Sequence, residues 1–261
     1  MEKLPPAFLK SMKNLLGEEF QSFLDSFKQP ATTGLRVNTL KISPRELRER
    51  VPYGLTPLPW SPAGFRLSET QPGCDQPSPG KHSYHAAGLY YLQEPSAMAV
   101  AEAIEPQPGE HILDLCAAPG GKATHLAALL GNRGLLMANE IHPGRVWELA
   151  ENLERWGAQN VVITNESPKR LADKLGAFFD KVLVDAPCSG ESMFRKSVTA
   201  RLEWSPQVVR SCAKRQSVIL KESVRLVRPG GLLVYSLVRS IPGRTKRSSL
   251  TYWLGIVALN S

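Results

Sequence analysis

Two short motifs, each placed at the end of an apolar run, limit this chain to an α/β fold of the nucleotide-binding kind. The first is Asp114-Leu-Cys-Ala-Ala-Pro-Gly-Gly-Lys122, and the second is Val184-Asp-Ala-Pro-Cys-Ser-Gly190. Residues 111–115 are predicted to form a buried strand and residues 123–130 a helix, with the glycines allowing a tight turn between them. Such a strand, turn and helix is typical of dinucleotide-binding sheets.

Two familiar nucleotide sites fit the first motif less well. A P-loop needs glycine at the position of Cys116 and serine or threonine at that of Ala123, so phosphate binding is not favoured. The glycine spacing also differs from that of nicotinamide enzymes, although residues 135–140 predict a second strand ending in Glu140, an acid that can bind ribose. An adenosine-bearing ligand without an essential pyrophosphate fits best. The alternative is a glycine turn that only packs a helix on a sheet.

The second motif adds a thiol. Residues 179–185 are predicted to form the fourth strand, and Cys188 follows at its carboxyl end, where open α/β sheets bind ligands. An isolated cysteine is most often a buried and inert residue. A cysteine between proline and Ser-Gly in a loop above a sheet is a better candidate for chemistry, because the loop can expose the thiol and direct backbone donors toward it.

Six motifs follow one another from near the amino terminus to Ser236. They are Leu35-Arg-Val-Asn-Thr-Leu40, Tyr91-Leu-Gln-Glu-Pro-Ser96, Cys116-Ala-Ala-Pro-Gly-Gly-Lys122, Asp185-Ala-Pro-Cys-Ser-Gly190, Met193-Phe-Arg-Lys196 and Pro229-Gly-Gly-Leu-Leu-Val-Tyr-Ser236. In this order they resemble the bacterial Sun-type (Nol/Nop/Sun) RNA cytosine-C5 methyltransferases of the 16S ribosomal RNA branch. The resemblance implies a Rossmann-like S-adenosylmethionine-dependent methyltransferase sheet and a small N-terminal α+β domain.

The same resemblance implies the site residues. Asp185 would face the methyl donor and the target base, Glu140 would bind the cofactor ribose, and Ser192 and Ser167 replace a glycine and an acid usual in the family. The residues expected to bind S-adenosylmethionine also include Cys116, Ala117, Ala118, Pro119, Gly120, Gly121 and Lys122. Those expected to contact RNA are Arg36, Asn38, Arg195 and Lys196, for which an ordinary solvated basic surface is the alternative.

The expected nucleophile is missing from this chain. Cytosine C5 methylation needs a thiolate that adds to carbon 6 of the base. In the resembled family this thiol belongs to a Thr-Cys pair after the last quoted strand, while the cysteine matching Cys188 assists product release; in related DNA enzymes that second cysteine is itself the nucleophile. Here Leu237-Val238 replaces Thr-Cys, and residues 237–261 contain no cysteine. Weak or absent activity follows, with a noncatalytic remnant that binds cofactor or RNA as the alternative.

Residues 237–261 also differ in composition from the rest of the chain. They carry Arg239, Arg244, Lys246 and Arg247 but no acid, and so hold half of the formal charge of +8. Codons for the family's usual continuation, read one base late, can spell residues 237–247. Our hypothesis is a frameshift or truncation after Ser236, against a naturally divergent tail. The sheet should then be incomplete at its carboxyl end, with residues 232–235 an apolar, aggregation-prone edge unless residues 252–259 cover it.

Composition and apolar patterns predict the domain bounds, the strands and helices, and the cellular setting of the protein. The domains predicted are residues 1–90 for an accessory, RNA-binding domain, 91–236 for the methyltransferase domain and 237–261 for the non-family tail. Strands are expected near residues 112, 135, 161, 182 and 232, and helices near 124, 146 and 168 and over 208–227. Dispersed cysteines and the lack of an apolar leader or membrane-length run favour a cytoplasmic protein. A monomer is expected. The pI of about 9.4 agrees weakly with 16S ribosomal RNA or the small ribosomal subunit as the partner.

Smaller patterns make further predictions. Residues 6–27 should form amphipathic helices with Leu15, Phe20, Leu24 and Phe27 on one face, and Ser43 with Glu46 should form a capping box. The tryptophans at helical positions, Trp147, Trp156 and Trp204, are expected in the core. The loosely spaced Cys74, His82 and His85 do not make a convincing zinc site, so no metal is expected.

Overall fold

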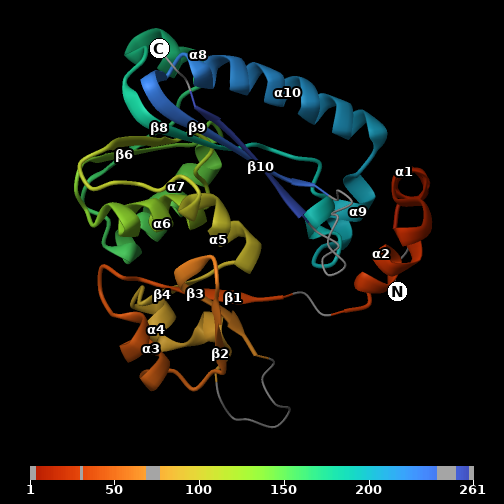
Figure 1. Cartoon of the computed structure of the whole chain (residues 1–261), viewed down its shortest axis with the longest axis horizontal. Helices are drawn as coiled ribbons and strands as arrows, with labels where there is room; N and C mark the ends of the chain where they lie inside the picture. The colour runs from red at the N-terminus through yellow and green to blue at the C-terminus, as the bar shows by residue number, and fades with distance from the viewer. Residues whose placement is uncertain (1–3, 30–31, 69–76, 240–250, 259–261) are drawn as a thin grey trace.

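The computed structural model describes residues 4–29, 32–68, 77–239 and 251–258. Figure 1 shows two sheets, a small one built from the N-terminal part and a larger one built from the rest, with a pair of N-terminal helices lying to one side. Within the described ranges, no helix has both the length and the apolar character needed to cross a membrane.

The small sheet is antiparallel and runs in the order β2-β3-β1-β4. Its elements are β1 (Gly34–Val37), α3 (Pro44–Arg50), β2 (Leu55–Leu58), β3 (Ser61–Leu67), the 3-10 turn η2 (Pro79–Lys81), α4 (Ser83–Ala86) and β4 (Tyr90–Leu92). The predicted capping box is confirmed, because the Ser43 hydroxyl accepts the Glu46 N–H while the Glu46 carboxylate accepts the Ser43 N–H. Leu35, Leu47, Phe65 and Tyr90 form the core of this sheet.

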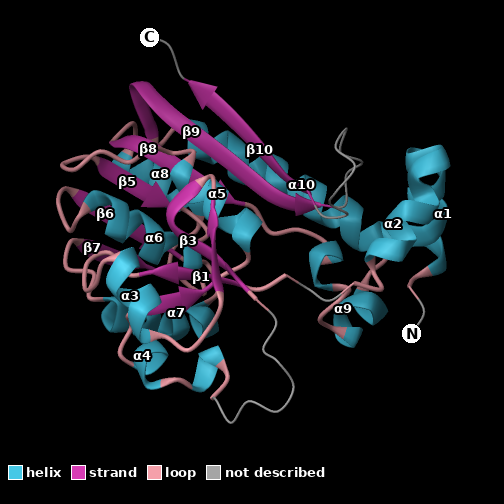
Figure 2. Ribbon diagram, turned by 60° about the horizontal axis from the view of Figure 1, so that its bottom comes forward, coloured by secondary structure: helices cyan, strands magenta, loops and turns pink. Residues whose placement is uncertain are grey.

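The N-terminal helices α1 (Pro6–Leu16) and α2 (Phe20–Ser26), joined by η1 (Gly17–Glu19), pack elsewhere. The fully buried Phe8 of α1 meets the rings of Phe194 and Trp204 edge-on, with ring centroids 5.0 and 5.5 Å apart. Figures 1 and 2 show α2 beside α9 (Val198–Glu203). Phe20, Leu24 and Phe27 join this cluster as predicted. The predicted burial of Leu15 is wrong: it is 54% exposed, because Leu16 packs against the cluster at the end of α1.

The larger sheet runs in the order β10-β9-β8-β5-β6-β7. Its strands are β5 (His111–Asp114), β6 (Leu135–Asn139), β7 (Val161–Thr164), β8 (Phe179–Asp185), β9 (Val227–Arg239) and β10 (Thr251–Ala258). All pairs are parallel except β9 with β10. The predicted Rossmann-like sheet is therefore confirmed, with its strands close to the expected positions.

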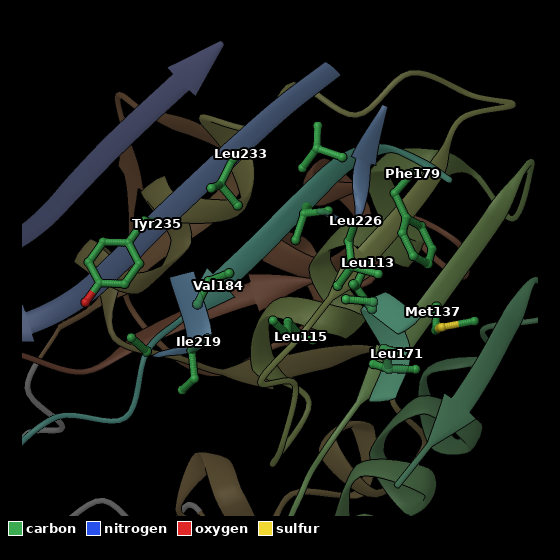
Figure 3. Close-up of a cluster of buried hydrophobic side chains, with 14 residues drawn as sticks. Leu113, Leu115, Met137, Leu171, Phe179, Val184, Ile219, Leu226, Leu233 and Tyr235 are labelled. Carbon is green, nitrogen blue, oxygen red and sulfur yellow. The ribbon is translucent and has the colours of Figure 1, made fainter. Parts of the chain in front are cut away.

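Helices cover both faces of the larger sheet (Figure 2). They are α5 (Pro95–Glu102), α6 (Gly121–Leu130), α7 (Pro143–Trp156), α8 (Pro168–Leu175) and α10 (Pro206–Val224). The short η3 (Glu191–Met193) and α9 (Val198–Glu203) lie instead beside the N-terminal helices (Figure 1). Figure 3 shows the apolar cluster on one face, where Leu171 of α8 and Ile219 of α10 pack against Leu113 and Val184 of the strands. The other face is covered by α5, α6 and the end of α7.

The three tryptophans divide between the core and the surface. Trp156 and Trp204 are buried as predicted. The prediction for Trp147 is wrong, because its side chain is 78% exposed. Helix α7 turns Leu149 and Leu153 toward the sheet and leaves Trp147 on its outward side.

At the carboxyl end, β9 continues past Ser236 to Arg239 and pairs along its length with β10. The pairing runs from Thr251 opposite Arg239 to Ala258 opposite Leu232. Residues 232–235, predicted to form an apolar edge, are thus covered by β10. Arg244, Lys246 and Arg247 of the basic tail lie outside the described residues.

Candidate functional site

The two motifs meet at the point where the order of the larger sheet reverses. Strand β5 has β6 on one side and β8 on the other, so the loops after β5 and β8 leave the sheet side by side at its carboxyl end. Lys122 Nζ lies 2.6 Å from Asp185 Oδ2, and Ser236 Oγ donates to Asp185 Oδ1 at 2.7 Å. Open α/β sheets bind ligands at such switch points.

A glycine turn begins α6 at this point. Gly120 caps the helix at φ of +113°, a conformation that favours glycine, and a Cβ there would lie 3.2 Å from Asn152 Cβ. Two side chains of α7 support the loop before it: Arg145 donates to Ala118 O at 2.6 Å, and Asn152 donates to Pro119 O at 2.8 Å. The first-turn N–H groups of α6 are left facing the carboxyl end of the sheet.

Glu140 follows β6 on the next strand along the sheet. Its side chain is 4% exposed, and Oε1 accepts the N–H of His142 at 2.9 Å while Oε2 lies 3.3 Å from Arg145 Nη1. These contacts hold the carboxylate in one orientation beside the loop that Arg145 supports. Ser167 serves as the cap of α8, accepting the N–H of Arg170 at 3.2 Å.

Asp114 is a site residue to which the sequence reasoning gave no role. It ends β5 and is fully buried, and no side chain among the described residues donates a hydrogen bond to its carboxylate, which faces the backbone N–H of Cys116. Burial raises the pKa of Asp114 to about 7, although the nearby Lys122 opposes that shift. An acid at the end of an apolar strand, directly before a glycine turn, is the sequence signal that could have identified it. A buried carboxylate without a side-chain donor suits a ligand that brings donors or positive charge.

The thiols of the site are held in their neutral form. Burial raises the pKa of Cys188, and the neighbouring Asp185 carboxylate raises it further. Burial also raises the pKa of Cys116, in the loop after β5. The structure therefore brings the Cys188 thiol near the Asp185 carboxylate, and the Gly190 N–H, which lowers the pKa of the thiol, does not offset its burial.

The four residues predicted to contact RNA occupy different places. Lys196 is exposed, and Arg195 is half-buried with its guanidinium 5.8 Å from the centre of the Phe27 ring. Arg36 and Asn38 are fully buried and make only internal contacts in the hydrogen bonds described here, which does not agree with their predicted role. The guanidinium of Arg36 and the amide of Asn38 therefore form hydrogen bonds within the protein.

Two residues of the weak metal candidate, His82 and His85, make other contacts in the structure. His82 Nδ1 accepts the N–H of Tyr84 at 3.1 Å, and the ring of His85 lies 5.6 Å from that of Tyr90. Cys74 lies outside the described residues. Over the part of the chain that the structure describes, no group of three or more potential metal ligands comes together.

Comparison with known proteins covers nearly the whole chain. A family model described as 16S rRNA methyltransferase RsmB/F matches residues 101–245, and one described as the N-terminal domain of 16S rRNA methyltransferase RsmF matches residues 4–95. Ribosomal RNA small subunit methyltransferase F of Erwinia tasmaniensis is 40% identical over 89% of this chain and 50% of its own length. That of Klebsiella pneumoniae is 38% identical over 96% of this chain and 53% of its own.

Solved structures agree with these matches. The crystal structure of a methyltransferase homolog protein from Pyrococcus horikoshii aligns with a TM-score of 0.76 and 32% identity, covering 88% of this chain and 72% of that one. The chain spans about half the length of the curated relatives it matches.

Proposed function

This chain belongs to the RsmB/F family of 16S rRNA methyltransferases, and on that premise we propose that it binds S-adenosylmethionine at the switch point of its larger sheet. The observation that carries the proposal is the convergence of the α6 glycine turn, the oriented Glu140 carboxylate and the buried Asp114 carboxylate at one edge. These groups fit the cofactor, because it offers ribose hydroxyl donors and positive charge to carboxylates. Residues 116–122 would enclose it.

Bound S-adenosylmethionine supplies an activated methyl group, and the remaining tasks belong to the side chains of the site. Glu140 would accept the ribose hydroxyl hydrogens, and the first-turn amides of α6 would donate to the ligand. Lys122 and Ser236 hold the Asp185 carboxylate, which would then face the methyl donor and the target base. The exposed Lys196 supports RNA as the substrate class, as does the family.

We further propose that the reaction class is methylation of cytosine C5 in 16S ribosomal RNA and that this chain performs it poorly or not at all. Carbon 5 becomes reactive only after a thiolate adds to carbon 6. The position directly after Ser236 holds Leu237 and Val238, and burial keeps Cys188 and Cys116 as neutral thiols. The frameshift hypothesis for residues 237–261 remains our explanation for the missing Thr-Cys pair.

Cofactor binding is tested by titration calorimetry of the whole chain with S-adenosylmethionine. The wild-type chain should bind, and Glu140→Ala should bind about tenfold more weakly because a charge-assisted hydrogen bond is lost. Glu151→Ala, an exposed acid on the neighbouring α7, is the matched control and should bind as the wild type does. Equal affinity in all three proteins would remove Glu140 from the site.

The missing nucleophile is tested with RNA containing 5-fluorocytosine. The wild-type chain should form no covalent complex and transfer little methyl from labelled cofactor. A variant with Thr-Cys in place of Leu237-Val238 should gain both, since a thiol then adjoins the Asp185 region. If the wild-type chain instead methylates RNA rapidly and Cys188→Ala abolishes the reaction, Cys188 is the nucleophile and our assignment of roles is wrong. Cofactor binding without transfer in every variant would favour the noncatalytic alternative.

A further inference from the structure

Arg36 is a buried charged residue that joins the small sheet to the cofactor end of α6. It extends from β1 and is fully buried. Its Nη1 donates to Gly121 O at 2.6 Å and to Gln93 Oε1, and its Nη2 donates to Thr124 Oγ1 at 2.7 Å. Nε is buried without a partner among the described residues, so the directed bonds of Arg36 all come from its two Nη groups. Burying a guanidinium is costly, and these bonds indicate a specific task for the charge.

The surroundings of Arg36 keep its charge and fix its plane. Its guanidinium carbon lies 4.8 Å from the centre of the Trp156 ring and 5.5 Å from that of Tyr91. Burial lowers the pKa of Arg36 to about 9, so the group is still protonated at neutral pH. The guanidinium lies against the rings of Tyr91 and Trp156 and donates to three acceptors, so its orientation is fixed.

The acceptors of Arg36 determine the direction of the amides in the glycine turn. A peptide unit is planar, so fixing the carbonyl of Gly121 also fixes the N–H of Lys122. Thr124 also restrains the preceding peptide unit, between Gly120 and Gly121. Its hydroxyl accepts from Arg36 and donates to Gly120 O at 2.7 Å. The N–H of Gly121 is in the same plane as that carbonyl. Both amides belong to the first turn of α6, ahead of the first helical bond from Thr124 N to Gly120 O.

Asn38, two residues along the chain, provides the comparison. It is equally buried and also crosses between the two parts of the molecule, donating to Trp156 O at 2.7 Å and to Gly88 O at 2.8 Å. These acceptors lie at the end of α7 and before β4, away from the glycine turn. Asn38 therefore fastens the same interface without touching the loop.

We propose that Arg36 is a positioning residue for the cofactor site, which aims the Gly121 and Lys122 amides at the ligand from the small sheet. The inference rests on the proposed function for the identity of the ligand. It assigns to the N-terminal part of the chain a share in cofactor affinity, separate from any contact with RNA.

The test compares Arg36→Lys and Thr124→Val with Asn38→Ala. Lysine keeps the charge but cannot fork to Gly121 and Thr124 together, and valine removes the relay hydroxyl at constant volume. Calorimetry at a temperature where all variants are folded should give S-adenosylmethionine affinities about tenfold lower for Arg36→Lys and Thr124→Val. Asn38→Ala should stay within about twofold of the wild type even where its melting temperature falls further.

Hydrogen exchange in the absence of ligand gives a second readout. Amides of residues 124–126 should exchange faster in Arg36→Lys and Thr124→Val but not in Asn38→Ala. If the wild-type chain fails to bind S-adenosylmethionine, the proposed function fails while exchange still decides whether Arg36 holds the turn. Unchanged exchange and affinity in Arg36→Lys, or an equal loss of affinity in Asn38→Ala, would overturn the proposal.

Discussion

At the scale of single residues, the site contains a charge that the free protein accommodates badly. Asp114 is fully buried, no side chain of the described structure donates a hydrogen bond to it, and burial raises its pKa from an ordinary value of 3.8 to about 7. The folded state then binds a proton more tightly than the unfolded state. The contribution of Asp114 to stability is therefore fully present below about pH 4 and is lost as the pH rises through about 7, a change on the order of 4 kcal/mol at most.

Asp114→Asn should remove this pH dependence. The amide cannot ionise, so the variant should unfold at higher denaturant concentration than the wild type at pH 8, with little difference at pH 4. Chemical unfolding at several pH values checks the prediction. Glu151→Gln, which changes an exposed acid, should keep the wild-type slope. Parallel slopes for Asp114→Asn and the wild type would show that Asp114 is already neutral or already paired.

At the scale of elements, β10 protects the edge of the larger sheet. Antiparallel pairing along residues 232–239 occupies backbone groups of β9 that would otherwise be open to another chain. The strand carries the buried Leu233, Val234 and Tyr235, so an uncovered edge would be both apolar and unpaired.

A chain ending at Arg239 should aggregate. Without β10 the β9 edge can pair between molecules, and light scattering should reveal large species that increase with protein concentration. Gly255→Pro in the full chain is the matched variant, because it removes one backbone donor opposite Tyr235 without shortening the protein. It should aggregate more than the wild type and less than the shortened chain. Monodisperse, sharply melting behaviour of the shortened chain would mean that β10 is not needed to protect β9.

At the scale of the whole molecule, the N-terminal helices stabilise a segment far along the chain. Phe8 of α1 is fully buried against Phe194 and Trp204. The centre of its ring lies 6.0 Å from that of Phe23. Glu191 accepts the Trp204 indole N–H at 3.2 Å and the Ser189 hydroxyl at 3.1 Å, so the cluster continues to the residue beside Cys188.

Phe8→Ala should loosen this part of the molecule. Removing a buried aromatic side chain costs about 3–5 kcal/mol, and hydrogen exchange over residues 189–204 should rise while the N-terminal sheet keeps its protection. Leu15→Ala, an exposed leucine of the same helix, should have little effect. If both variants leave residues 189–204 equally protected, the N-terminal helices do not hold that segment.

The sequence by itself determined the features that depend on short stretches of chain. Short apolar runs predicted the parallel strands of the larger sheet, helical apolar patterns predicted most of its helices, and the Ser43 and Glu46 spacing predicted the cap of α3. The glycine turn and the Pro-Cys loop were predictable because parallel strands bring their carboxyl ends to one edge. These outcomes need no knowledge of distant contacts.

Only the tertiary structure decided which polar groups became internal. Arg36 reaches Gly121 across 85 positions of sequence, and nothing in the local pattern distinguishes it from a surface arginine. Leu15 and Trp147 are exposed against expectation, because the sequence of a helix identifies its apolar side chains but not how much of the helix surface other elements cover. The raised pKa of Asp114 has the same origin, because the burial of the last acid of a strand depends on which distant segments pack over it.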